Sequence, residues 1–537
     1  MTQPSFFDAN AMVGNPVFSP TTGTVTGYAC AADLLPEMDH HGISGGLVTH
    51  WDATFHAASG NRRLTEEIEG SNRLFPCWVV LPHHTGEMDE PKKLVKKLVA
   101  GNVKAVKLLP VRYQFSLEPW SVGGLLRELA RHGIVTFIEL PGSGRPVGEP
   151  DEHALSTLLA LCREYPELPV VASAALRKLY PLLDRCRNLY VSTAWEPHPG
   201  MLEDVAERFG AERILFATPH CEIADGVSGA AKAMVMYADL KDGEKSLIAG
   251  GNLRRLLGVV RLPSPGDTVR GKIQRCADAG SPVGVEIIDN HLHLGPNPSE
   301  YKPSWSEKQL LRTMERIGSM KACANSTVAT WGGNHVEENT AIAAACRRHP
   351  DRLIGFAVIN PRFENAAGEI RRCFAMGMRG LKIHPRIHAC DLGDARYIPV
   401  WEASERHGIP VLAHTGRGQA YSEPGAFDAI AGRHPKGTFI LGHSGETFEG
   451  IRISIEIARK RKNVFLDMSG WGFMRRGVLE YAVRHAGVDK VLFGSDYSWV
   501  DIPYHLGIVF YAGLTDAEKT KVLGSNARRI LGIRREK

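Results

Sequence analysis

IIDNHLHLG (Ile287–Gly295) repeats, with substitutions, the pattern FFDANAMVG (Phe6–Gly14) found near the start of the same 537-residue chain. Four more segments recur in the same order: AVKLLP (Ala105–Pro110) as GLKIHP (Gly380–Pro385), RHGIVTFIELPG (Arg131–Gly142) as RHGIPVLAHTG (Arg406–Gly416), ERILFATP (Glu212–Pro219) as DKVLFGSD (Asp489–Asp496), and GGNLRRLLG (Gly250–Gly258) as GSNARRILG (Gly524–Gly532). Five matches in one order predict a duplication, two copies of one fold in a single chain.

Each half alternates short apolar runs with longer amphipathic patterns. In the second half the expected strands are EIIDNHLHL, ACANST, IGFAVI, GLKIH, VLAHT, FILGH, VFLDM and VLFGS. Continuous apolar strands separated by helices are typical of a parallel sheet covered on both faces. Eight such units in a half of about 250 residues favour a (β/α)8 barrel over a doubly wound open sheet. The predicted fold class is α/β, with two tandem TIM-like barrels.

The two predicted barrels span residues 1–262 and 285–537. Residues 263–284 lie between them, and Pro, Gly and Ser at both ends of this stretch predict a linker. A short helix is expected inside it, over residues 269–279. A chain of this length exceeds one ordinary core, which agrees with two domains of about 250 residues each.

Composition excludes several classes of protein. The chain is 43% hydrophobic and 23% charged, with 64 basic and 59 acidic residues, and its basic residues form no dense block, so a nucleic-acid partner is not expected. No run of 18 or more apolar residues predicts a membrane span, and the N-terminus lacks the pattern of a signal peptide. The ten cysteines are scattered singly, as reduced thiols of a cytoplasmic protein would be.

Polar side chains stand at the ends of several strands in the second half. His291 and His293 end the first strand and, two residues apart, point to the same face. His414 ends the fifth strand, His443 the sixth, and Asp496 the eighth. Catalytic side chains of a (β/α)8 barrel lie at these carboxyl ends. One histidine alone is more often a packed core residue, but imidazoles and a carboxylate converging on one mouth predict a divalent metal site suited to Zn²⁺.

The first half is an internal control for this site. At the corresponding five positions it carries, in order, Asn10, Met12, Glu139, Ser173 and Pro219. Framework residues are retained there, namely Asp8, Lys107 and Asn252. If these five residues serve one site, all of them are expected to be replaced together in an inactive copy. If each serves packing, only some of them are expected to differ. The first barrel is therefore predicted to be catalytically inactive.

The motifs DNHLHLG, VLAHTG, ILGHSG, LFGSD and NARRILG, which together span residues 285–533, resemble the amidohydrolase superfamily. The resemblance is to the amidohydrolase-2 branch, which includes aminocarboxymuconate-semialdehyde decarboxylase, resorcylate-type decarboxylases and several lactonases. The first half resembles the same family with its motifs eroded. This resemblance implies one divalent metal held by His291, His293, His414 and Asp496, with His443 acting as an acid/base or polarising the substrate.

Lys382, in the fourth strand, has two interpretations. In binuclear branches of the superfamily a lysine at this place is carbamylated and bridges two metals, so a second metal is an alternative to the single ion. Its counterpart Lys107 persists in the first half, which favours a structural role.

Several further residues are candidates for contact with a substrate. His384 lies on the face of Lys382, and Arg386 and Arg417 follow the fourth and fifth strands, where a guanidinium could clamp a carboxylate. Trp331, Tyr497 and Trp499 fall in the expected loops. For each of these, packing or an ordinary surface position is the alternative.

The predicted activity is metal-dependent hydrolysis of an amide, lactone or ester bond in a small acidic molecule, with His443 and Asp496 as the catalytic pair. The first alternative is non-oxidative decarboxylation of a small carboxylic acid at the same site. The second alternative is a binding protein without catalysis. The two barrels are expected to pair within the chain, with Arg112 or Arg145 as candidate contributors, and a homo-oligomer remains open.

Overall fold

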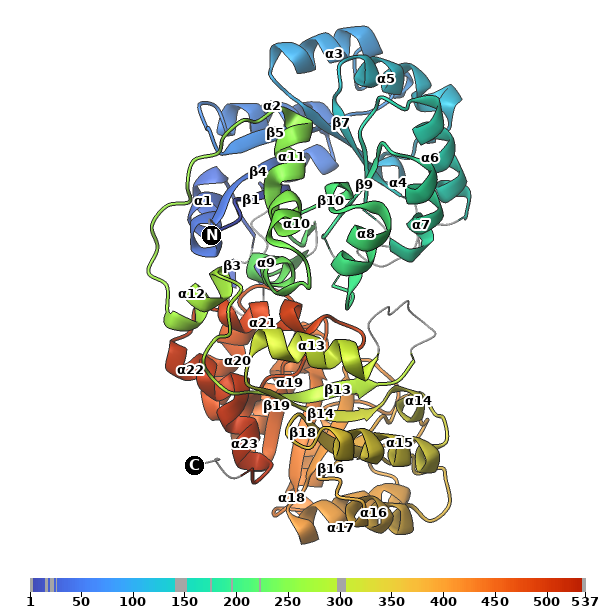
Figure 1. The fold of residues 1–537 in the computed structure, drawn as a ribbon, viewed down its shortest axis with the longest axis vertical. Helices are drawn as coiled ribbons and strands as arrows, with labels where there is room; N and C mark the ends of the chain where they lie inside the picture. The colour runs from blue at the N-terminus through green and yellow to red at the C-terminus, as the bar shows by residue number, and fades with distance from the viewer. Residues whose placement is uncertain are drawn as a thin grey trace. The chain divides into compact units, whose positions relative to one another are not determined.

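The computed structural model describes residues 3–14, 18–19, 24–25, 27–140, 152–173, 176–194, 197–221, 224–296 and 306–533. The chain divides into two compact units (Figure 1). Unit 1 is Met1–Ser19, Val25–Pro197 and Met201–Arg270, and unit 2 is Pro20–Thr24, His198–Gly200 and Gly271–Lys537. None of the helices among these described residues is long and apolar enough to cross a bilayer.

Unit 1 contains one eight-stranded parallel sheet. Its strands, in spatial order, are β1 (Phe6–Val13), β4 (Ile43–His50), β5 (Leu74–Val79), β6 (Ala105–Leu108), β7 (Val135–Glu139), β8 (Val170–Ser173), β9 (Leu189–Ser192) and β10 (Ile214–Leu215). The principal helices are α1 (Ala31–His41), α2 (Ala57–Glu67), α3 (Pro91–Ala100), α5 (Pro119–Arg131), α6 (Glu152–Glu164), α7 (Leu176–Arg185), α8 (Met201–Phe209), α9 (Ser228–Tyr237) and α11 (Asn252–Leu257). The Ala9 N–H donates to the Phe216 carbonyl over 2.9 Å, which links the last segment of the sheet to the first.

Unit 2 repeats this order. Its strands are β13 (Ile287–Leu294), β14 (Met320–Ser326), β15 (Leu353–Val358), β16 (Gly380–Ile383), β17 (Pro410–Gly416), β18 (Thr438–Gly445), β19 (Val464–Asp467) and β20 (Val491–Leu492). Its principal helices are α12 (Lys272–Asp278), α13 (Glu307–Ile317), α15 (His335–Arg348), α16 (Ala366–Ala375), α17 (Ile398–His407), α18 (Ala426–Arg433), α19 (Phe448–Lys460), α20 (Val478–Ala486), α21 (Ile502–Phe510), α22 (Asp516–Thr520) and α23 (Asn526–Ile530). The Asn290 N–H donates to the Phe493 carbonyl over 2.9 Å and closes the ring of strands. The prediction of two tandem (β/α)8 barrels is confirmed, and the open doubly wound sheet is excluded.

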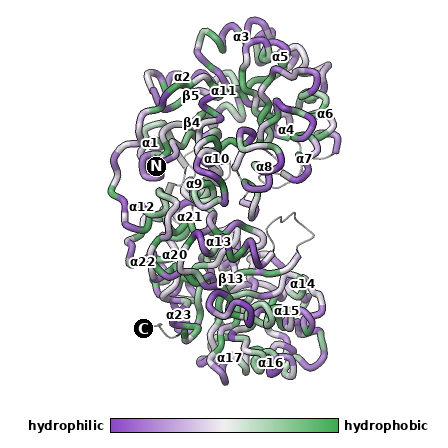
Figure 2. Tube along the Cα trace, viewed as in Figure 1, coloured by the Kyte–Doolittle hydropathy of each residue, from purple (hydrophilic) through white to green (hydrophobic). Residues whose placement is uncertain are grey.

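The strands are buried on both faces because helices cover the outside and side chains fill the inside. All eight residues of β13 are buried. The core of unit 2 joins residues from most strands: Ile288, Cys323, Phe356, Leu412, Ile440, Phe465, Leu492 and Ala527. Figure 2 shows hydrophilic and hydrophobic residues mixed along outer helices such as α3 and α13. This distribution explains the continuous apolar strands and amphipathic helices of the sequence.

Polar contacts that hold the barrels together recur in both units. Asp8 accepts hydrogen bonds from the backbone N–H of Thr218 (2.9 Å) and from its hydroxyl. Asp289 accepts the same two bonds from Ser495, with 3.0 Å to the N–H. Each carboxylate ties the first strand of its barrel to the segment after the last strand. The retention of Asp8 in the first half is therefore structural.

A pair of asparagines makes a second matched contact. The Asn252 amide donates to the carbonyls of Ala211 and Ile214 (2.8 and 2.9 Å). The Asn526 amide donates in the same way to Val488 and Val491 (2.8 and 2.9 Å). These paired hydrogen bonds hold the segment that leads into the eighth strand, so the persistence of Asn252 is also structural.

The segment predicted as a linker carries α12, which starts three residues later than the expected helix. Its Asp278 accepts a 2.8 Å hydrogen bond from the Tyr511 hydroxyl, and the Lys272 N–H donates to Asp516 over 2.6 Å. Both contacts lie inside unit 2, so the change from one unit to the other falls at Arg270 and Gly271.

Candidate metal centre

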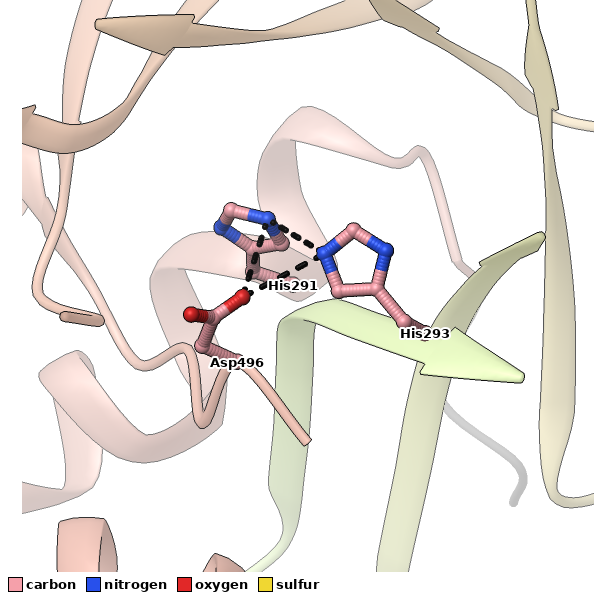
Figure 3. Close-up of side chains that lie close together, drawn as sticks. All are labelled: His291, His293 and Asp496. Carbon is pink, nitrogen blue, oxygen red and sulfur yellow. Dashed lines mark hydrogen bonds and ion pairs between the residues drawn. The ribbon is translucent and has the colours of Figure 1, made fainter. Parts of the chain in front are cut away.

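Strand β13 supplies two of the predicted ligands. His291 and His293 are two residues apart, so the alternation of the strand turns both side chains to the barrel interior. Both are buried, with 0% and 3% exposure. Asp496 follows β20, and its N–H donates to the His291 carbonyl over 2.8 Å. This backbone bond brings the carboxylate beside the two imidazoles (Figure 3).

The three side chains point their ligand atoms at one another. His291 Nε2 lies 3.2 Å from His293 Nε2. The Asp496 Oδ1 atom lies 3.6 Å from the first nitrogen and 3.3 Å from the second. Two ligand atoms at about 2.0–2.1 Å from a tetrahedral zinc ion are about 3.3 Å apart. The spacing and the N,N,O donor set therefore fit a divalent cation.

Asp467 gives this group the support that a metal-binding histidine needs. Its Oδ2 lies 2.7 Å from His291 Nδ1, which leaves Nε2 directed at His293 and Asp496. Ligating histidines commonly donate their second N–H to a carboxylate in this way. Asp467 ends β19 and is completely buried.

Lys382 contacts the same histidine. Its Nζ lies 2.6 Å from His291 Nε2, and burial lowers the pKa of the lysine to about 8. In unit 1 the Lys107 Nζ lies 3.2 Å from Asn10 Oδ1. Both lysines thus reach the residue at the same place on the first strand. Whether Lys382 bridges a second metal stays a prediction.

His414 lies in a neighbouring group. Its ligand atom, with those of His443 and Glu446, forms a cluster whose atoms are within 4.8 Å of one another. His414 Nε2 lies 2.8 Å from Gln419 Oε1, and the ring stacks on His384 at 3.9 Å. Three of the four predicted ligands therefore converge, and the fourth is beside them with its Nε2 facing Gln419.

Burial keeps the imidazoles of this region neutral. It lowers the pKa of His414 to about 3 and the pKa values of His291, His293 and His443 well below the ordinary range. Neutral imidazole is the form that binds a metal. Glu446 shifts in the opposite direction, because burial and the nearby Asp496 carboxylate raise its pKa to about 7.

The backbone is left-handed at three residues that carry these groups, one near the end of β18 and two in loops. The φ angle is +60° at His443, +57° at Glu446 and +57° at Asp496. Such a conformation costs a non-glycine residue about 1–3 kcal/mol and clusters at functional sites. Pro219 replaces Asp496 in the first barrel, and the proline ring forbids a positive φ.

Two predicted substrate-contact residues lie beside the site. The ring of Trp499 meets His293 edge-on at 4.9 Å, and Trp331 stacks on Trp499 at 5.9 Å. Trp331 is 48% exposed, and its ring centroid lies 6.4 Å from His384. These side chains form an aromatic wall next to the ligand group. Tyr497 is buried instead, and its backbone carbonyl accepts from the His293 N–H.

The arginines differ in their surroundings. Arg386 is exposed, and its positive charge affects two groups of the site. It opposes part of the rise in the pKa of Glu446 and adds to the fall in the pKa of His414. Arg417 forms ion pairs with Glu423 (3.0 Å) and Glu449 (3.6 Å). Its charge is thus already compensated by two carboxylates away from the ligand group.

The carboxyl ends of the strands in unit 1 carry different side chains. Within the described part of the chain, no group of three or more potential ligands lies in this unit. Glu139 is exposed, and Met12 is buried at the place of His293. Arg112 lies over the Phe55 ring at 5.2 Å, and Arg145 lies outside the described residues.

Three residues of the site escaped the sequence analysis. Asp467 ends its strand as the predicted ligands do, so the same signal was present. Ser469 follows the end of β19 by two positions, and Glu446 follows the end of β18 by one. Short-range spacing did not separate them from ordinary loop residues.

Comparisons with known proteins agree with the duplication. The model of the family described as Amidohydrolase matches residues 27–259 and, separately, residues 288–533. Gamma-resorcylate decarboxylase from Rhizobium radiobacter is 23% identical over 245 residues, covering 36% of this chain and 75% of that protein. The decarboxylase of the same name from Rhodococcus jostii (strain RHA1) is 23% identical over 251 residues, covering 37% and 76%.

Two of the solved structures similar to this chain each cover 46% of it. An uncharacterized TIM-barrel protein from Bordetella bronchiseptica has a TM-score of 0.40 at 20% identity, over 46% of this chain and 99% of its own. The 2,6-dihydroxybenzoate decarboxylase from Rhizobium has a TM-score of 0.39 at 18% identity, over 46% and 99%.

Proposed function

The chain belongs to the amidohydrolase family through both of its barrels, and on that premise we propose that the second barrel is a metal-dependent, non-oxidative decarboxylase of a small aromatic carboxylic acid. The observation that carries this proposal is the convergence of His291, His293 and Asp496 in the second barrel, with no such group among the described residues of the first. The first barrel is proposed to be inactive.

The choice of reaction rests on the relatives. The sequence alone favours hydrolysis and leaves decarboxylation as the first alternative. The curated relatives that match across three-quarters of their length are gamma-resorcylate decarboxylases. They support the second of these reactions for this chain, and the aromatic wall of Trp331 and Trp499 is suited to a planar acid.

One divalent cation is proposed at His291, His293 and Asp496, with His414 as the predicted fourth ligand. The N and O donors suit Zn²⁺. When bound, the cation would polarise the carboxylate of the substrate and a neighbouring oxygen as a Lewis acid.

The protein's own groups supply the proton. Decarboxylation replaces a C–CO₂⁻ bond by a C–H bond, so one proton must reach carbon. The Glu446 carboxyl, with a pKa of about 7, holds a proton near neutral pH and lies close to Asp496. We assign that proton to the transfer. His443, neutral at this pH, orients a substrate oxygen through its ring.

Product analysis tests the proposal. Purified protein of known metal content would be given hydroxylated benzoates, and CO₂ release would be measured beside hydrolysis of lactone, ester and amide panels. Release of one CO₂ per substrate consumed, with one deuterium entering the product in D₂O, is expected. Hydrolysis without CO₂ release would contradict decarboxylation and favour the hydrolase alternative. Pairing of the two barrels and the oligomeric state stay predictions.

A further inference from the structure

We propose that Asp467 and Ser469 are positioning residues that fix which ring nitrogen of His291 and of His443 carries the hydrogen. Through these contacts the ligand histidine and the catalytic histidine share one buried support. The inference rests on the proposed metal site but not on the identity of the reaction.

Apart from the His291 ring, the groups that contact Asp467 are hydrogen-bond donors. Its oxygens accept the backbone N–H groups of His443 (3.0 Å) and Ser469 (3.2 Å) and the side-chain amide of Asn290 (3.1 Å). That amide also donates to the Phe493 carbonyl over 2.6 Å, which fixes its orientation. Surrounded by these donors, the two Asp467 oxygens act as acceptors.

The tautomer of His291 follows from these contacts. A carboxylate only accepts, so the His291 Nδ1 at 2.7 Å must carry the hydrogen. The Nε2 atom then keeps its lone pair, and this is the nitrogen that faces His293 and Asp496.

The tautomer of His443 follows from the serine. The Ser469 hydroxyl has one hydrogen, and it donates this hydrogen in a 2.5 Å hydrogen bond to Asp467 Oδ2. Ser469 Oγ also lies 3.0 Å from His443 Nδ1, and toward this nitrogen it can only accept. The hydrogen of neutral His443 therefore sits on Nδ1, and its Nε2 acts as an acceptor.

The first barrel lacks this support. Aligned strands put Ser192 at the place of Asp467, and Ala194 at the place of Ser469. His505 is a fully buried histidine near Asp467: burial lowers its pKa, and the Asp467 charge opposes part of that shift. Aligning YADL (Tyr237–Leu240) with YAGL (Tyr511–Leu514) puts Ala231 at the place of His505 in the first barrel. Residues that hold the barrel together, such as Asp8, are retained. The support was lost together with the ligands, as expected if it serves the site.

The test compares two buried aspartates of the same unit. In Asp467→Asn an NH₂ group replaces one of two oxygens that both face donors, so the support of His291 is weakened. The Zn²⁺ dissociation constant, measured by chelator competition, should rise about 10–100-fold. The control is Asp278→Asn, a buried aspartate of the same unit that accepts a hydrogen bond from the Tyr511 hydroxyl. It should change the Zn²⁺ affinity less than about 3-fold. Equal losses in both variants, or no loss in Asp467→Asn, would overturn the proposal.

A second measurement covers the case in which Asp467→Asn fails to fold. Side-chain ¹⁵N NMR of the metal-free wild-type chain, assigned with His291→Gln and His443→Gln, should show both rings protonated on Nδ1. Ser469→Ala should keep this state for His291 and release it for His443. Protonation of either wild-type ring on Nε2 contradicts the inference. Failure of the decarboxylase proposal would instead appear as metal binding with the expected tautomers but no CO₂ release.

Discussion

The two barrels of this chain keep the same architecture and differ at their mouths. Asp8 and Asp289 close their sheets through matched bonds to Thr218 and Ser495. Between these anchors, the first barrel has Asn10 where the second has His291. The polar residues that hold the fold and those that make the site are therefore two separable sets. Because one chain contains both copies, comparing the two barrels is enough to distinguish the framework residues from the site residues.

The largest expected effect comes from the ligand set. His291→Ala or His293→Ala should lower kcat/KM by about 10³-fold or more, because a catalytic metal supplies several kcal/mol of transition-state stabilisation. The matched changes in the first barrel, Asn10→Ala and Met12→Ala, should leave the rate within about 2-fold. Steady-state CO₂ release measures both. A loss caused by the first-barrel variants would break the assignment of one active and one inactive copy.

Glu446 should have the next largest effect. Glu446→Gln removes the proposed proton and should lower kcat by about 10²-fold or more. In the wild type the raised pKa of about 7 means that the carboxyl is protonated at lower pH, so the rate should fall as pH rises through 7. The variant should lose this limb of the pH–rate profile. Glu449→Gln, in an exposed residue three positions on, is the control and should keep the limb.

The framework set should behave alike in both barrels. Asn252→Ala and Asn526→Ala each leave two backbone carbonyls without their amide donor and should cost about 1–3 kcal/mol of unfolding free energy. Denaturant titration followed by hydrogen exchange would locate each loss in its own barrel. A loss confined to the second barrel would mean that Asn252 is a relic rather than a structural residue.

Arginine substitutions should have the smallest effects. Arg417→Ala should change KM less than about 2-fold, because its pairs with Glu423 and Glu449 are exposed and weak. Arg386→Ala removes a charge that lowers the pKa of Glu446, so the alkaline limb should move to higher pH. The first-barrel control is Arg112→Ala, with no effect expected. A large KM rise in Arg417→Ala would restore it as a carboxylate clamp.

The sequence predicted the barrels and the proximity of His291, His293 and Asp496 because both follow from local patterns. The apolar run at Ile287–Leu294 predicted β13, and the two-residue spacing of His291 and His293 predicted that both side chains point into the barrel. Comparison of the two halves then separated site residues from framework residues. Asp289 and Asn526 belonged to the framework for this reason.

What the sequence could not predict depends on tertiary contacts. The position of Glu446 requires left-handed backbone at His443, Ser444 and Glu446, which only surrounding packing can impose on residues other than glycine. The pairing of Arg417 with two glutamates depends on the paths of two loops. Asp467 ends a strand, but its role becomes visible only when β19 lies beside β13 in the closed barrel.

Metal content per chain tests the central claim most directly. Elemental analysis of the full chain should give about one equivalent of divalent metal. The double variant His291→Ala/His293→Ala should give none, and the matched variant Asn10→Ala/Met12→Ala should keep the full equivalent. A metal-free wild type, or an equivalent that survives loss of both histidines, would contradict the placement of the site in the second barrel.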